Sequence, residues 1–168
     1  MGLTTLVSCE EYLHTSYDPD VDYVDGELED RNVGEKDHSK LQRNLLIWLH
    51  THRKELGIEA FPEQRVRVSP TRYRVPDICV TLGEPDEQVF TKPPFLCVEI
   101  LSLEDRAGRM QRKISDYLQA GVPCVWVIDP RTRDAFIYTS SGMRSVQDGI
   151  LRTQDPEIQV PLEALFED

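Results

Sequence analysis

A single glutamate interrupts one of the most apolar segments of the chain. Glu99 lies in FLCVEIL, residues 95–101, which predicts a central buried strand. Burying an unpaired carboxylate is costly, so this side chain needs a cationic partner, a raised pKa or a metal ion. A second carboxylate, Asp77, stands in VPD at the entry to the preceding predicted strand. If the two strands are antiparallel neighbours, both carboxylates share one face and repel each other unless a cation lies between them.

Carboxylate oxygens are hard ligands that suit Mg²⁺ or Mn²⁺, with water molecules completing the coordination shell. The spacing of Asp77 and Glu99 also allows a simpler interpretation. In that alternative Asp77 caps a turn and Glu99 is an ion-paired strand residue. The two positions alone leave both interpretations open.

The segment after Glu99 predicts a helix over residues 104–120, with a basic stripe beside an apolar face. Arg106, Arg109, Lys113 and Tyr117 follow one another at helical offsets, so they share this stripe. Lys113 stands at the edge of the apolar face and could reach the end of the Glu99 strand. There an ammonium group could orient or deprotonate a water molecule, or stabilise charge on phosphorus. The alternative is a solvated basic stripe.

His38 and Glu27 are weaker candidates. His38 begins the predicted helix 38–56, three residues before the first apolar position, and is either a substrate contact or a capping residue. Glu27, in VDGEL at residues 24–28, is either a third acidic ligand or a solvated hairpin residue. The chain has no GxxxxGK[ST], GxGxxG, GxSxG or HExxH motif, so we expect no organic cofactor.

The remaining pattern predicts an α/β sandwich around a mixed sheet. The acidic segment 18–37 predicts a loop or a short hairpin around Asp25-Gly26. A short apolar piece at residues 162–166 is expected to close the core. The predicted elements are a helix at 38–56, strands at 64–69, 74–82 and 95–101, a helix at 104–120, and strands at 124–129, 135–139 and 150–153.

Length and composition fit one globular domain over residues 1–168. No apolar run reaches the roughly 20 residues of a membrane span, and the first residues lack the basic region of a signal peptide. The four cysteines have no metal-ligand spacing, which favours buried thiols in a reducing cytoplasm. We therefore expect a soluble cytoplasmic protein.

The net charge of -11 argues against nucleic acid, because phosphate contacts dominate that kind of affinity. The charge is segregated, however. Residues 18–37 are strongly acidic, whereas residues 38–74 and 106–113 are basic. The chain therefore has local surfaces that could contact phosphates.

An ordered set of motifs resembles the Uma-two family of restriction endonucleases, within the PD-(D/E)XK superfamily. The resemblance covers residues 20–166 and includes DGEL at 25–28 and His38. The other motifs are VPD at 75–77, VEILS at 98–102, KISDY at 113–117, AGVP at 120–123 and WVIDP at 126–130. The order of these motifs is fairly specific, while each motif alone is weak.

The resemblance implies a restriction-endonuclease-like fold with an α-β-β-β-α-β core and a metal-dependent endonuclease that hydrolyses DNA. It implies that Asp77, Glu99 and the backbone carbonyl of Ile100 bind the metal. The superfamily's lysine normally lies two residues after the acid, where this chain has Leu101, and the family pattern moves it to Lys113. By analogy the protein is a homodimer, and Arg106 and Arg109 contact phosphates.

Three positions depart from the family pattern. Leu103 replaces a usual proline, Arg109 stands where an acid is common, and Cys124 replaces an acid after Val-Pro. None of these changes removes an expected metal ligand. Two alternatives remain open: a non-catalytic binding module, which the net charge favours, and a nuclease that acts on RNA.

Overall fold

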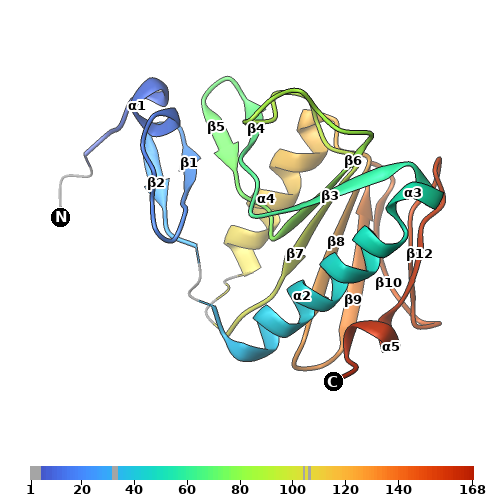
Figure 1. Ribbon diagram of the computed structural model, residues 1–168. Helices are drawn as coiled ribbons and strands as arrows, with labels where there is room; N and C mark the ends of the chain where they lie inside the picture. Colours follow the sequence, from blue (N-terminus) through green and yellow to red (C-terminus); the bar gives the residue numbers. More distant parts are fainter. Residues whose placement is uncertain (1–4, 32–33, 104, 106) are drawn as a thin grey trace.

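The computed structural model describes residues 5–31, 34–103, 105 and 107–168. A six-stranded mixed sheet forms its centre, in the order β10-β9-β8-β7-β6-β3 (Figure 1). Its strands are β3 (Ile58–Pro62), β6 (Ile78–Leu82), β7 (Leu96–Ile100), β8 (Cys124–Asp129), β9 (Asp134–Thr139) and β10 (Gly142–Ser145).

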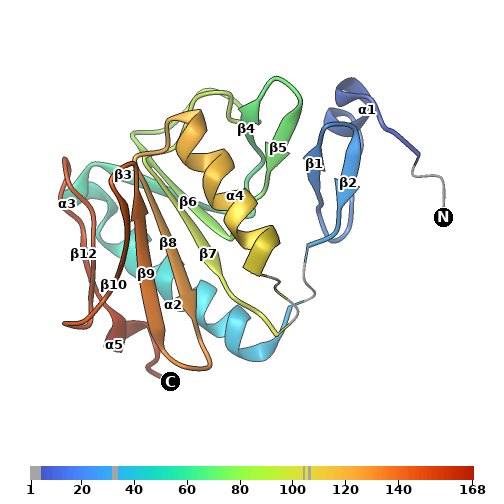
Figure 2. The same ribbon diagram turned by 180° about the vertical axis from the view of Figure 1, so that it is seen from behind.

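Two helices cover opposite faces of this sheet, as the views from the two sides show (Figures 1 and 2). Helix α2 (Lys36–Thr51) lies on one face, and α4 (Ala107–Ala120) lies on the other. Strands β7 and β8 are parallel because α4 connects them, whereas the other neighbours in the sheet are antiparallel. The order α2-β3-β6-β7-α4-β8 is the expected α-β-β-β-α-β core, so the predicted fold class is confirmed.

The alternation of side chains in β6 and β7 divides the core into two layers. Ile78, Val80 and Val98 pack with the leucines of α2. Cys79 and Cys97 pack with the apolar face of α4. Both faces are covered, which explains why β7 reads as a continuous apolar run. Side chains two positions along the strand from either cysteine therefore also point toward α4, and the site lies on this face of the sheet.

A second, four-stranded sheet is formed by strands from the N-terminal half of the chain, in the order β2-β1-β5-β4. Its strands are β1 (Asp22–Val24), β2 (Glu27–Glu29), β4 (Val66–Ser69) and β5 (Arg72–Arg74). The β1–β2 turn has positive φ at Asp25 and Gly26, 51° and 94°, as a tight two-residue hairpin turn requires. The predicted hairpin is thus confirmed. The short helix α1 (Cys9–Leu13) packs on this sheet through Tyr12.

The predicted strand at 74–82 is wrong as a single element. It is two strands in two sheets, with β5 ending at Arg74 and β6 beginning at Ile78. Pro76 lies between them, and a proline has no N–H with which to continue a ladder. The crossing at residues 75–77 carries the chain from one sheet to the other and places Asp77 directly before β6, an inner strand of the central sheet.

The first strand of the core is β3, which the pattern did not predict. Only Ile58 of its five residues is buried, so the apolar alternation is weak. The predicted strand at 64–69 belongs to the second sheet as β4. The helix expected over 38–56 begins earlier, at Lys36, and is divided at His52 into α2 and α3 (Arg53–Leu56), with Gly57 as a left-handed cap.

The C-terminal segment completes the layer that contains α2. Strands β11 (Ile150–Arg152) and β12 (Gln159–Pro161) form a hairpin, and α5 (Leu162–Leu165) follows. Leu151, Val160 and Leu165 join the same apolar cluster as the α2 leucines. None of the described helices has the length and apolar character that crossing a bilayer requires.

Candidate functional site

Asp77 and Glu99 face each other across neighbouring strands. The antiparallel register pairs Ile78 with Val98, so the next position outward pairs Asp77 with Glu99. Directly opposite residues of an antiparallel pair point to the same face, here the face covered by α4. Both are almost completely buried, at 4% and 3% exposure. The two strands are antiparallel neighbours, which is the condition under which the sequence predicts that both carboxylates share one face.

Glu99 is held by the helix above it. The hydroxyl of Tyr117 donates a hydrogen bond of 2.6 Å to Oε1 of Glu99. Burial raises the pKa of Glu99 to about 7, with the charge of Lys113 opposing this and that of Asp77 adding to it. The ionisation of Glu99 near neutral pH therefore depends on the charged groups around it, such as Lys113 and Asp77.

Asp77 is fixed by three donors. Its Oδ2 accepts a hydrogen bond of 2.7 Å from the backbone N–H of Ile100. Its Oδ1 lies 3.0 Å from Nη2 of Arg31 and 3.2 Å from Nε2 of His38. Burial alone would raise the pKa of Asp77, but His38 and Arg31 hold that pKa below its ordinary value. Asp77 is therefore a carboxylate at neutral pH, and of the two interpretations left open for His38, the structure places its side chain at the site.

Lys113 comes from α4 and lies next to these carboxylates, at 9% exposure. Burial opposes its charge, but Glu99 and Asp22 outweigh burial and raise the pKa of Lys113 above its ordinary value. Lys113 is thus an ammonium group at neutral pH. In this position it can orient a water molecule or stabilise negative charge.

These residues surround one small polar pocket of about 20 Å³, which is room for a single water molecule or small ion. The pocket is lined by Arg31, His38, Asp77, Glu99, Ile100, Asp105 and Lys113. Larger hollows are found elsewhere on the molecule, but they do not contain this set of charges. The structure therefore brings five of the predicted residues together: His38, Asp77, Glu99, Ile100 and Lys113.

Sequence reasoning missed Arg31. This residue stands in the acidic segment 18–37, where it looked like a solvated charge. The structure brings its guanidinium to Asp77, with a second contact of 3.4 Å to Glu63. No local signal in the sequence marks it, because its place depends on how the chain leaves the β1–β2 hairpin.

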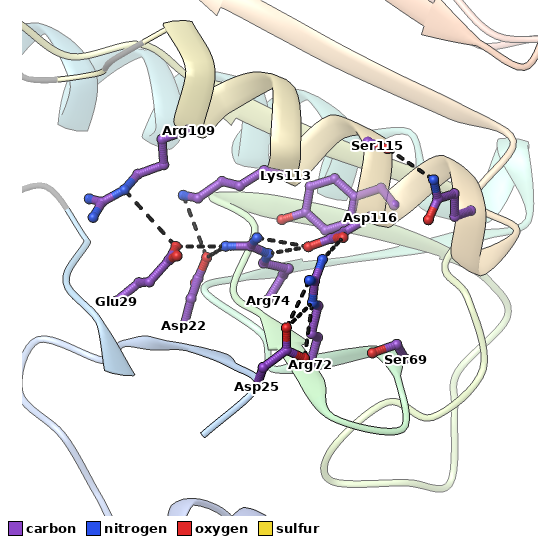
Figure 3. A network of polar contacts seen from close by, with 12 residues as sticks. Asp22, Asp25, Glu29, Ser69, Arg72, Arg74, Arg109, Lys113, Ser115 and Asp116 are labelled. Atoms are coloured by element: carbon purple, nitrogen blue, oxygen red, sulfur yellow. Dashed lines mark hydrogen bonds and ion pairs between the residues drawn. The ribbon is translucent and has the colours of Figure 1, made fainter. Parts of the chain in front are cut away.

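Asp22 was also missed, and it belongs to a buried ionic network beside the pocket (Figure 3). Arg74, which is completely buried, contacts Asp22 at 3.1 Å, Glu29 at 2.9 Å and Asp116 at 2.7 Å. Lys113 lies 3.7 Å from Asp22. The network joins the hairpin, β5 and α4, so it fixes the helix that carries Lys113.

The other predicted residues lie outside the pocket. Glu27 is exposed at the start of β2. Arg109 is on α4 near Glu29, at 4.0 Å, and its side chain is 42% exposed. Arg106 lies outside the described residues. Arg109 thus stands on the rim of the site, one helical turn before Lys113, and Glu27 does not line the pocket.

The acidic segment 18–37 and the basic region 38–74 neutralise each other in part. Arg65 contacts Asp20 at 2.8 Å, and Arg72 contacts Asp25 at 2.8 Å. Three of the arginines expected to face phosphates, Arg65, Arg72 and Arg74, are therefore engaged with carboxylates of the chain itself.

The donor set fits a divalent cation that keeps much of its water. Among the described residues, no group of three His, Cys, Asp or Glu side chains is arranged to hold a metal ion. The pocket is lined by three carboxylates, Asp77, Glu99 and Asp105, and by Ile100, and Asp77 and Glu99 are the two that face each other. Magnesium is bound in this way, through one or two carboxylates with water in the remaining positions. The residues present therefore fit Mg²⁺ or Mn²⁺, provided that Arg31 yields Oδ1 of Asp77.

Comparison with known proteins agrees with these features. The Uma-two family, described as "Putative restriction endonuclease", matches residues 9–166. A crystal structure described as "a putative nuclease belonging to DUF820", from Anabaena variabilis ATCC 29413, is similar with a TM-score of 0.81 and 22% identity. The similarity covers 95% of this chain and 97% of that chain, and it concerns the fold. No curated protein matches the chain. The family match extends over nearly the whole length, and the chain therefore belongs to the Uma-two family.

Proposed function

We propose that the protein is a metal-dependent endonuclease that hydrolyses DNA phosphodiester bonds. The observation that carries the proposal is the meeting of Asp77, Glu99 and Lys113 in one pocket, with the two carboxylates in register on neighbouring strands. Two buried carboxylates at such a position favour a cation between them. The family and the fold support a nuclease.

Each residue of the pocket has a distinct task in this proposal. Asp77 and Glu99, with the carbonyl of Ile100, hold Mg²⁺ or Mn²⁺. The bound cation supplies a Lewis acid that acidifies water and neutralises charge on the phosphoryl group. The Lys113 ammonium orients the attacking water and stabilises the negative charge that develops on phosphorus. His38 donates a hydrogen bond to Asp77 and contacts the substrate at the edge of the pocket.

The exposed groups around the pocket supply the contacts to the nucleic acid backbone. Arg109 stands on the rim of the site, and we include Arg106 on sequence position alone. Phosphate contacts of this kind give affinity and position, not sequence preference. We propose a homodimer, so that both strands of a duplex can be cut. The four cysteines are free thiols, in keeping with a cytoplasmic protein.

A second candidate is a nuclease-fold binding module without catalysis. It is favoured by the engagement of Arg65, Arg72 and Arg74 with the chain's own carboxylates, which leaves fewer cations for phosphates. The net charge of -11 also favours the binding module, because an acidic protein is repelled by phosphates.

Nicking of supercoiled plasmid in Mg²⁺ or Mn²⁺ tests the proposal. Wild-type protein is expected to nick or linearise the plasmid, and chelation should stop the reaction. Asp77→Asn, Glu99→Gln and Lys113→Met should each lose the activity, whereas Asp86→Asn, an exposed aspartate outside the pocket, should keep it. Equal nicking by all variants would identify a contaminant. If wild-type protein cleaves neither DNA nor RNA, the second candidate, a binding module without catalysis, is favoured.

A further inference from the structure

We propose that Asp22 is a positioning residue of the site, which holds the Lys113 ammonium in place between the hairpin and the metal-binding carboxylates. This inference rests on the proposed nuclease function, in which Lys113 has a catalytic task. It adds a buried carboxylate, supplied by the N-terminal hairpin, to the residues that line the pocket.

The two oxygens of Asp22 serve different elements of the fold. Oδ1 accepts a hydrogen bond of 3.0 Å from the backbone N–H of Val75, in the crossing that leads to Asp77. Oδ2 lies 3.1 Å from Nη1 of Arg74 and 3.7 Å from Nζ of Lys113 (Figure 3). One carboxylate therefore ties the segment that presents Asp77 to the side chain that presents the ammonium.

Asp22 is the nearest anion to the ammonium. Among the described residues, it alone places a carboxylate oxygen within 4.0 Å of Nζ of Lys113. Glu99, which lines the pocket with Lys113, also attracts the ammonium and raises the pKa of Lys113, without a carboxylate oxygen within ion-pair distance among the described residues. If Asp22 lost its charge, the ammonium would be drawn to Glu99, where it would compete with a cation. Asp22 thus keeps Lys113 beside the metal ligands without pairing it to them.

The burial of Asp22 is not explained by Arg74 alone. Arg74 already has Asp116 at 2.7 Å and Glu29 at 2.9 Å as partners. Asp22 is 1% exposed, and its desolvation is costly unless each oxygen is well paired. The contact with Lys113 distinguishes Asp22 from Glu29, which shares the Arg74 contact and has no such ion pair. Glu29 is therefore the matched control.

The experiment compares Asp22→Asn with Glu29→Gln, after both are shown to be folded by their thermal transitions. The first readout is the Lys113 ammonium resonance in ¹⁵N NMR, assigned from its loss in Lys113→Met. An ordered ammonium gives a resolved signal in wild-type protein. We expect Asp22→Asn to lose or displace this signal and Glu29→Gln to retain it. An unchanged signal in Asp22→Asn, or the same change in both variants, would overturn the inference.

The second readout is the cleavage rate at saturating metal. Asp22→Asn is expected to lower kcat about tenfold or more with little change in KM, because orientation of the ammonium matters in the transition state. Glu29→Gln should leave kcat near the wild-type value. If wild-type protein does not cleave, the proposed nuclease function fails while the resonance still decides the role of Asp22. If Asp22→Asn does not fold, Asp22→Glu keeps the charge and should shift the resonance.

Discussion

The hydroxyl of Tyr117 lies 2.6 Å from Oε1 of Glu99, one helical turn beyond Lys113 on α4. This hydrogen bond favours the charged form of a carboxyl group that burial would otherwise keep neutral. The same helix therefore brings both a hydroxyl and an ammonium group to Glu99.

Replacing Tyr117 by phenylalanine removes this bond without changing the shape of the core. We expect Tyr117→Phe to lower the free energy of unfolding by about 1–3 kcal/mol, the usual cost of leaving a buried acceptor unpaired. Urea denaturation measures this. Tyr138→Phe is the control, because that hydroxyl only receives a bond of 3.3 Å from Gln111 near the surface. Equal midpoints for the two variants would show that the Glu99 contact contributes nothing.

Arg31 and His38 both contact Oδ1 of Asp77, so a cation that binds this oxygen must displace one of them. We expect Arg31→Gln to bind Mn²⁺ more tightly, on the order of threefold to tenfold, because a nearby positive charge is removed. Calorimetry measures the affinity, with Arg112→Gln, an exposed residue of α4, as the control. Weaker binding by Arg31→Gln would mean that the guanidinium supports the shape of the site.

The raised pKa of Glu99 gives the metal site a pH dependence. Its pKa of about 7 lies above the ordinary value of 4.5, so protonation of Glu99 stabilises the metal-free fold at low pH. That stabilisation is lost as the pH rises through 7. A cation binds the ionised carboxylate of Glu99, so the affinity for the cation rises as the pH rises. We expect Mg²⁺ to bind roughly tenfold more tightly at pH 8 than at pH 6. Equal Mg²⁺ affinities at pH 6 and pH 8 would show that ionisation of Glu99 does not control metal binding in this pH range.

The sequence allows the centre of the site to be predicted because its residues break local rules. Glu99 is a charged residue inside an apolar strand, and Asp77 follows Pro76, which lies between two strands. Lys113 sits at the edge of an apolar helical face. Each violation of the expected pattern calls for a reason, and the structure places all three around one pocket.

Arg31 and Asp22 could not be predicted, because they look like ordinary charges in an acidic segment. Their positions depend on the pairing of β1 with β5, a contact between segments about fifty residues apart, since Tyr23 pairs with Tyr73. Strand β3 was missed for another reason: only Ile58 of its residues is buried, so its pattern does not stand out.

Calorimetric titration of Mg²⁺ and Mn²⁺ at pH 8, on wild-type protein, Asp77→Asn and Asp86→Asn, tests whether Asp77 holds a divalent cation. We expect one saturable site in wild-type protein and in Asp86→Asn, and its loss in Asp77→Asn, because the proposed site uses Asp77 as a ligand. Failure of wild-type protein to bind either ion up to millimolar concentrations would contradict the proposed metal site. Equal binding by Asp77→Asn would contradict it as well, because the cation would then lie elsewhere.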